Sequence, residues 1–236
     1  MKPHNLFIVF EGGDGSGKTS QAKALYKRLQ KKYPVIYTQE PGGTFLGQVL
    51  RRWLTLPSGE LPARPPENLQ IPFVEPAIGD ELLPDIAMQS TAPRAELLLF
   101  LIARAQLVDE VIRPNLEAGK VVICDRYAPS SVAYQGYGRG LALNLIEMAN
   151  QIATQGLKPD FIALLDLPPE RGLARKWTAT DHFEEEQLSF HHRVREGYLK
   201  MAAADPDRWL VIDAMLPKGK IAEIIWEKLS QLLPNL

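Results

Sequence analysis

Five short apolar runs recur along the chain of 236 residues, and polar or amphipathic stretches separate them. The runs are NLFIVF (5–10), VIYT (35–38), VVICD (121–125), FIALLDL (161–167) and WLVIDA (209–214). Continuous apolar strands that alternate with amphipathic helices are typical of a parallel sheet covered by helices on both faces. The pattern therefore predicts an α/β fold, and the chain length fits a single domain over residues 1–236.

Two of the intervening stretches show the clearest helical spacing. The first follows residue 19 and has Ala22, Leu25 and Leu29 on one side. The second covers residues 94–113, and its expected buried stripe consists of Leu98, Leu101, Ala105, Val108 and Ile112.

Residues 55–93 interrupt this alternation, because eight of the nineteen prolines lie between Pro57 and Pro93. Proline removes a backbone donor and disfavours both a regular helix and a central strand. We interpret the segment as a solvated surface insertion, with one short element around GDELLPDIAM, rather than as a lid or a partner site.

The composition narrows the classes of partner and location. With 27 basic and 28 acidic residues, the net charge of −1 provides no general field for nucleic acid or acidic membranes, so neither is expected as a partner. The single cysteine, Cys124, excludes an internal disulfide and suits a reducing compartment. The N-terminal apolar stretch is too short for a signal peptide, and no 18 apolar residues run together, so we expect a cytoplasmic protein.

The stretch EGGDGSGKTS (11–20) carries the pattern G-x-x-x-x-G-K-[ST] between a predicted strand and a predicted helix. Glycines let successive backbone N–H groups converge on phosphate oxygens, and the positive end of the helix dipole adds to the attraction. Lys18 would reach the outer phosphates, and the Thr19 hydroxyl would bind Mg²⁺. The candidate triphosphate-binding residues are Gly12, Gly13, Gly15, Ser16, Gly17, Lys18, Thr19 and Ser20.

Other polar segments follow the remaining strands, so the same sheet edge should collect them. These segments are Gln39–Thr44, Asp125–Tyr127 and Asp166. Arg126 can offer its planar fork to a second phosphate; the alternative is a salt bridge between Asp125 and Arg126. Phe100 and Arg104 are four residues apart on one helix face, where they could stack on a base and bond to its edge; the alternative is a core Phe and a surface Arg.

The chain resembles thymidylate kinases over residues 5–54 and 94–213. FEGGDGSGKTSQ, EPGGT, LRRWL, AELLLFLIARAQLV, DRYAPSSVAYQGYGRG, KPDFIALLDLPPERGLAR and FHHRVREGYLKMA occur in the order and approximate spacing of that family. The resemblance implies a P-loop nucleoside monophosphate kinase core with a five-stranded parallel sheet. It also implies phosphorylation of dTMP to dTDP for dTTP synthesis, with ATP and Mg²⁺, and a homodimer.

The resemblance further implies roles for individual residues. Phe100 would stack on thymine and Arg104 would bond to its edge, in a base pocket lined by Ser131 and Gln135. Arg51 and Arg126 would hold the 5′-phosphate of the acceptor. Asp14 would contact the 3′-hydroxyl, with Glu11 as a nearby acid, and Tyr134 would close over position 2′. Thr19 and Glu184 would serve Mg²⁺. The residues expected to act in catalysis are Lys18, Asp14, Arg126 and Arg175.

Two departures from the family pattern leave the activity open. Gln39 stands where many relatives have an arginine, and His182 replaces an arginine in the lid segment 171–186. Because the glycine loop has no basic residue between Gly12 and Gly17, positive charge over the transferred phosphoryl group must come from Arg171, Arg175, Lys176 or His182. A slow enzyme or one with a shifted pH optimum is therefore predicted. The alternatives are a kinase for another pyrimidine deoxynucleotide such as dUMP, and a non-catalytic nucleotide-binding descendant with a regulatory role.

Overall fold

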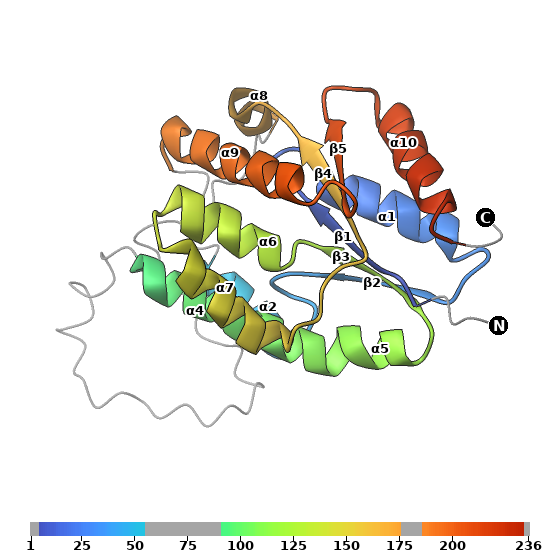
Figure 1. The fold of residues 1–236 in the computed structure, drawn as a ribbon, viewed down its shortest axis with the longest axis horizontal. Helices are drawn as coiled ribbons and strands as arrows, with labels where there is room; N and C mark the ends of the chain where they lie inside the picture. The colour runs from blue at the N-terminus through green and yellow to red at the C-terminus, as the bar shows by residue number, and fades with distance from the viewer. Residues whose placement is uncertain (1–4, 55–90, 176–185, 234–236) are drawn as a thin grey trace.

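The five apolar runs form one parallel sheet, as predicted (Figure 1). The computed structural model describes residues 5–54, 91–175 and 186–233. The strands are β1 (Phe7–Glu11), β2 (Val35–Gln39), β3 (Val121–Asp125), β4 (Phe161–Asp166) and β5 (Trp209–Asp213), in the order β2-β3-β1-β4-β5. Because all neighbouring strands are parallel, their carboxyl ends meet at one edge of the sheet.

Helices connect the strands and cover both faces of the sheet (Figure 1). They are α1 (Lys18–Leu29), α2 (Phe45–Leu54), α4 (Pro93–Leu107), α5 (Arg113–Glu117), α6 (Ala128–Ser131), α7 (Leu143–Thr154), α8 (Pro169–Ala174), α9 (Leu188–Ala204) and α10 (Lys218–Ser230). Two π-helical stretches, Val108–Ile112 and Val132–Gly138, continue α4 and α6.

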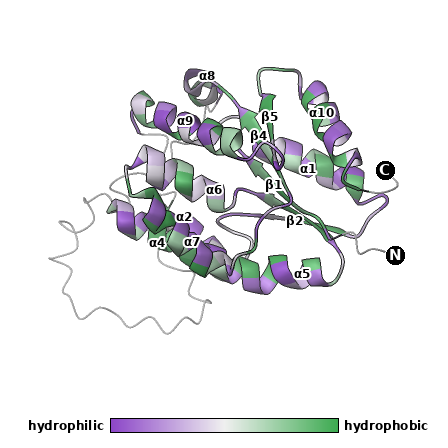
Figure 2. Cartoon of the chain, viewed as in Figure 1, coloured by the Kyte–Doolittle hydropathy of each residue, from purple (hydrophilic) through white to green (hydrophobic). Residues whose placement is uncertain are grey.

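The inner strands β1, β3 and β4 read as continuous apolar runs because both of their faces pack against helices. In β1, Phe7 and Val9 belong to a core shared with α9 and the residues around Leu107. Ile8 and Phe10 point to the other face, toward α1 and α10. Figure 2 shows the same arrangement, with green strands inside and helices that are part green and part purple. The expected stripe Ala22, Leu25 and Leu29 is buried on α1, as predicted.

Two details around α4 differ from the sequence prediction. Leu98 is 57% exposed, because the buried pair of this turn is Leu97 and Leu101, and Leu98 is rotated about 100° from Leu97 around the helix. Pro93 is part of α4 rather than of the insertion, since proline is tolerated in the first helical turn. The rest of the predicted insertion, residues 55–90, lies outside the described residues.

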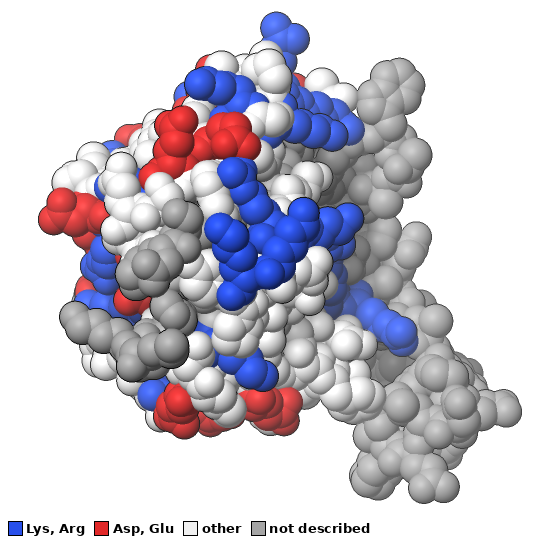
Figure 3. Space-filling view, turned by 90° about the vertical axis from the view of Figure 1, so that its right-hand side faces the viewer, with Lys and Arg blue, Asp and Glu red and all other residues white. Residues whose placement is uncertain are grey.

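The side of the molecule that holds both termini carries a group of basic side chains with acidic ones around it (Figure 3). On this side α1 ends with Lys27 and Arg28 in its last turn, where cations suit the negative end of the helix dipole. Arg28 pairs with Glu223 at 2.7 Å and stacks on Trp226, so it has structural partners. Among the described residues, no helix has the length and apolar character needed to cross a membrane.

The glycine loop lies directly against α8. Gly15 has φ +71°, and a Cβ added there would lie 2.1 Å from the carbonyl oxygen of Gly172. A Cβ on Gly172 would in turn lie 2.2 Å from the carbonyl oxygen of Asp14. This contact between two backbones therefore requires glycine on both sides, and it fixes the position of α8 against the loop.

Gly15→Ala should lower the free energy of unfolding by about 2 kcal/mol, because it combines a left-handed backbone with a clash against α8. Gly13→Ala is the matched control, since the space around its Cβ is open and its φ is not positive. Denaturant unfolding of both variants checks the prediction. Equal stability of the two variants would contradict it.

Candidate active site

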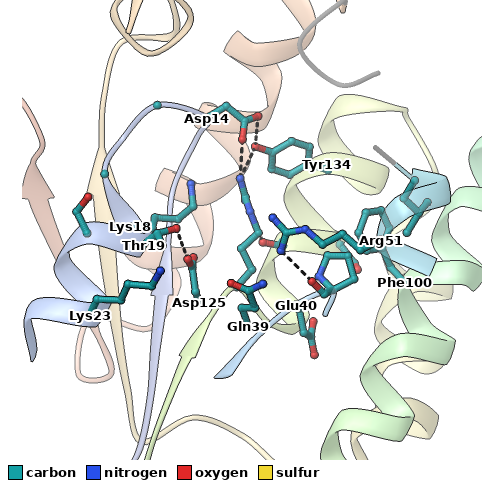
Figure 4. A pocket seen from close by; sticks show the side chains of 18 of the residues that line it. Asp14, Lys18, Thr19, Lys23, Gln39, Glu40, Arg51, Phe100, Asp125 and Tyr134 are labelled. Carbon is teal, nitrogen blue, oxygen red and sulfur yellow. Dashed lines mark hydrogen bonds and ion pairs between the residues drawn. The ribbon is translucent and has the colours of Figure 1, made fainter. Parts of the chain in front are cut away.

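A cavity of about 590 Å³ opens at the carboxyl ends of the strands (Figure 4). The predicted site residues that line it are Asp14, Gly15, Gly17, Lys18, Thr19, Ser20, Arg51, Phe100, Arg126, Ser131, Tyr134, Gln135 and Arg175. Gly12, Gly13, Ser16 and Arg104 are not among the lining residues. The structure thus brings most of the predicted residues to one site, although they come from distant parts of the chain.

Lys18 lies inside the glycine loop, where its ammonium group has three oxygen partners. It donates to the carbonyl oxygens of Gly12 (2.9 Å) and Gly13 (2.7 Å) and to Ser16 Oγ (3.4 Å). Burial, followed by the nearby positive charge of Arg126, lowers the pKa of Lys18 to about 8. Gly12, Gly13 and Ser16 therefore hold the lysine from behind, and the ammonium faces the cavity from the loop.

Thr19 and Asp125 place two side-chain oxygen groups next to each other beneath the loop. The Thr19 hydroxyl donates to Asp125 Oδ2, which joins the first turn of α1 to the end of β3 (Figure 4). Oxygen groups of this kind suit Mg²⁺, which needs only one or two protein ligands when phosphates and water complete its shell. In the described ranges no group of three or more His, Cys, Asp or Glu side chains gathers to hold a metal. Glu184 lies outside the described residues, and sequence reasoning had not assigned Asp125 to Mg²⁺.

Arg126 pairs with Asp14 rather than with its neighbour in sequence. Its Nη2 donates to Asp14 Oδ1 (2.7 Å) and to the Tyr134 hydroxyl (3.2 Å), and that hydroxyl donates to Asp14 Oδ2 (2.7 Å). The alternative of a salt bridge between Asp125 and Arg126 is wrong, because the residue adopts φ +72° and turns its side chain toward the glycine loop. Three residues predicted to bind the acceptor thus form one triangle.

A buried group of hydroxyls supports Arg126 from below. Its Nη1 donates to Ser130 Oγ (3.3 Å) and to the Tyr198 hydroxyl (3.4 Å), and both hydroxyls donate to Glu11 Oε2. Burial raises the pKa of Glu11, and the charge of Arg126 opposes this shift. Sequence reasoning missed Tyr198, because 187 residues separate it from Glu11 and no local pattern links them.

Arg104 is buried behind the wall of the cavity, so the alternative that it is a surface arginine is wrong. Its guanidinium pairs with Glu40 (2.8 Å) and donates to Asn150 Oδ1 (2.6 Å) and Ser131 Oγ (3.0 Å). Burial raises the pKa of Glu40 to about 7, against the opposing effect of Arg104. The expected contact of Arg104 with a base edge stays a prediction; Glu40 and Ser131, which both line the cavity, connect Arg104 to it.

The cavity is also lined by Gln39, Arg51 and Phe100 (Figure 4). Arg51 Nη1 donates to the carbonyl oxygen of Pro41 (3.1 Å), which ties α2 to the turn after β2. Lys23, which sequence reasoning had not singled out, lines the same cavity from α1. Asp166, expected at this edge, is bound by Arg195 in a two-point ion pair instead and does not line the cavity.

Arg175 lies between the main cavity and a second one of about 440 Å³. It donates to the carbonyl oxygens of Gly15 (3.4 Å) and Ala214 (3.3 Å). The second cavity shares Gly15, Gly17 and Ser20 with the first and continues to Leu216 and Ile221. Of the other lid residues, Arg171 is on α8, whereas Lys176 and His182 lie outside the described residues.

Comparison with known proteins identifies the family. A family model described as thymidylate kinase matches residues 10–68 and 77–225. A thymidylate kinase of Synechococcus sp. (strain JA-2-3B'a(2-13)) is 43% identical over 230 residues, covering 97% of this chain and 96% of the relative. One from Thermomicrobium roseum is 39% identical over 231 residues, covering 96% and 95%.

A solved structure agrees with these sequence matches. The crystal structure of thymidylate kinase from Ehrlichia chaffeensis superposes with a TM-score of 0.70 at 28% identity, covering 95% of this chain and 98% of that one. Because the family model covers well over half of the chain and the relatives match it nearly end to end, the chain belongs to the thymidylate kinase family.

Proposed function

We propose that the protein transfers the terminal phosphate of ATP to dTMP, giving dTDP and ADP, and that the central cavity divides into a donor half and an acceptor half. The observation that carries the proposal is that Lys18 and the triangle of Arg126, Asp14 and Tyr134 line one cavity. Donor and acceptor phosphates bound to these groups would meet between them. Nothing in the comparisons favours the alternative of a non-catalytic descendant.

In the donor half, the amides of the glycine loop and Lys18 bind the triphosphate. The second cavity, with apolar Leu216 and Ile221 beside Arg175, has the lining that an adenine ring needs. Thr19 and Asp125 would hold Mg²⁺, with Glu184 as a further candidate; when bound, the ion neutralises charge on the phosphates.

In the acceptor half, Arg51 and Arg126 hold the 5′-phosphate, and Asp14 and Tyr134 face the sugar. Phe100, Ser131 and Gln135 surround the base, and all three line the cavity. Because a phosphate oxygen is already an anion, no strong base is needed, and catalysis consists of alignment and charge neutralisation. Arg175 is the described lid residue positioned to contribute charge beside the loop.

Two further parts of the proposal concern assembly and location. The helices α2, α4 and α7 pack side by side (Figure 1) and expose Phe45 (61%), Leu98 (57%), Met148 (66%) and Ile152 (81%). An apolar face of this kind favours a partner, and we assign it to a second copy of the chain in a homodimer. Cys124 is buried as a thiol, which agrees with a reducing cytoplasm.

Arg126→Ala should lower kcat/KM for dTMP on the order of 10²- to 10³-fold, because the variant loses the main cation proposed to hold the acceptor phosphate. A coupled assay for ADP with ATP, Mg²⁺ and dTMP measures this. Arg28→Ala is the matched control, since that arginine pairs with Glu223 on the far side of the sheet. Absence of dTMP-dependent ADP formation in the unmodified protein would contradict the proposed function.

Affinity for ATP should fall as pH rises through about 8, because the cationic form of Lys18 binds the triphosphate and its pKa is lowered to about 8. Below that pH the lysine is already charged, so its contribution should be constant. Calorimetric titration with a non-hydrolysable ATP analogue from pH 7 to pH 9.5 measures whether the affinity falls with rising pH. Affinity that does not fall over this range would contradict the lowered pKa.

Met148→Glu should shift the protein from two chains toward one, because it places a charge in the exposed apolar face of α7. Sedimentation velocity measures the mass in solution. Leu188→Glu is the matched control, because Leu188 is also a partly exposed apolar residue (41%), at the start of α9. A dimer that persists in the Met148 variant would show that another surface forms the interface.

A further inference from the structure

One face of α4 contacts the two polar side chains of the base pocket. Glu96, Phe100 and Arg104 follow each other at intervals of four residues, so they lie on the same side of the helix. Phe100 lines the cavity itself. Glu96 contacts Gln135, and Arg104 contacts Ser131, each by a hydrogen bond. The side chains of the pocket are therefore held from behind by charged groups of opposite sign.

The contact with Glu96 decides which end of the Gln135 amide faces the cavity. Nε2 of Gln135 donates to Glu96 Oε1 at 2.7 Å, and both side chains are 1% exposed. An ionised carboxylate can only accept hydrogen bonds, so it binds the NH₂ end of an amide and not the carbonyl end. The carbonyl oxygen Oε1 is then the end available to a ligand, since Gln135 lines the cavity.

Two features compensate the negative charge of a carboxylate at this buried position. Arg139 Nη2 lies 3.0 Å from Glu96 Oε2, and Arg139 Nε donates to Oε1 at 3.4 Å. Glu96 is also in the first turn of α4, where the helix dipole favours negative charge. Arg139 is itself fixed by an ion pair with Glu186 and by the ring of Phe190, 4.8 Å away.

Arg104 orients the Ser131 hydroxyl, just as Glu96 orients the Gln135 amide, but as a donor instead of an acceptor. A guanidinium can only donate, and its Nη1 donates to Ser131 Oγ at 3.0 Å. The serine oxygen therefore serves as the acceptor toward Arg104, and its own proton is available to a ligand. The cavity wall thus presents a hydroxyl donor from Ser131 and a carbonyl acceptor from Gln135, one helical turn apart.

From this arrangement we propose that Glu96 is a positioning residue that makes Gln135 select a pyrimidine with a protonated N3, as in thymine and uracil, against cytosine. Thymine and uracil pair an N3–H donor with carbonyl acceptors, which match Gln135 Oε1 and the Ser131 hydroxyl. Cytosine has an acceptor at N3 and an amino donor at position 4, so it would face like groups on the wall. The inference rests on the proposed function, because it places the base of the acceptor beside Phe100.

The size of the effect follows from unpaired polar groups. A site built to bond to a particular group can reject an analogue that lacks it by about 10⁴-fold, because the buried groups of the site lose their partners. The pair of Ser131 and Gln135 should therefore give a large preference for dTMP and dUMP over dCMP. This preference over dCMP does not depend on the methyl group that distinguishes thymine from uracil.

Glu96→Gln tests the proposal, because a neutral amide can donate as well as accept. It therefore allows the side-chain amide of Gln135 to flip and present its NH₂ group to the cavity. The variant should lower the ratio of kcat/KM for dTMP to that for dCMP at least tenfold. Arg139→Gln should change the ratio in the same direction, since it removes the cation that holds the Glu96 carboxylate in place against Gln135. Asp160→Asn is the matched control: its carboxylate accepts from the Phe7 amide at the amino ends of the strands, away from the cavity.

Binding measurements separate this inference from the proposed function. Dissociation constants of dTMP and dCMP, measured by calorimetry in the absence of ATP, give the same selectivity without any turnover. In Glu96→Gln and Arg139→Gln, both nucleotides could bind more weakly while the ratio of their dissociation constants stays unchanged. That result would show that Glu96 only supports the fold, and it would overturn the proposal. Failure of the unmodified protein to phosphorylate dTMP would instead overturn the proposed function. Thermal unfolding of each variant confirms that folded protein is compared.

Discussion

The ion pair between Arg126 and Asp14 joins the two halves of the site. Asp14 belongs to the glycine loop after β1, and Arg126 directly follows β3, the neighbouring strand of the sheet. The arginine reaches the loop because its backbone takes a left-handed conformation, which costs energy for a residue with a side chain. Bonds to Ser130 and Tyr198 and the charge of Glu11 offset that cost. The spacing between the loop and the acceptor side therefore depends on Arg126, which also donates to the carbonyl oxygen of Gly12 (3.3 Å).

Buried carboxylates have a common role at the wall of the cavity. Glu11, Glu40 and Glu96 are all nearly inaccessible, and each bonds to a residue of the wall or to an arginine that does so. Glu11 orients Ser130 and Tyr198, Glu40 pairs with Arg104, and Glu96 binds Gln135. Removing a charge from water is costly unless it is paired, so such residues persist where a fixed orientation is needed. The polar edge of the pocket is thereby set before a ligand arrives.

The charge of the site is distributed differently from that expected by analogy with the family. Gln39 lines the cavity at the position where the family resemblance implies an arginine, and Lys23 contributes a cation to the same cavity from one turn beyond Thr19 on α1. Arg175 is bonded to the outer side of the glycine loop. An ammonium group on a flexible stem provides charge without the two-point geometry of a guanidinium. A lower rate than that of relatives with the arginine remains a prediction of this difference.

The sequence by itself determined the features that depend on local pattern and chain order. The five strands, the helix after Lys18 and the glycine loop were all predictable, since each requires only a run of neighbouring residues with a given periodicity or motif. Because parallel strands align their carboxyl ends, even the meeting of Asp14, Gln39 and Arg126 at one cavity followed from the predicted architecture, whereas Phe100 was assigned to the site by the family resemblance. Only the tertiary structure decided which groups pair. It joined Asp125 to Thr19 rather than to Arg126, buried Arg104, exposed Leu98, and brought Tyr198 to Glu11 and Glu96 to Gln135. Such contacts depend on how helices pack against one another over long separations in sequence, and no local pattern encodes that packing.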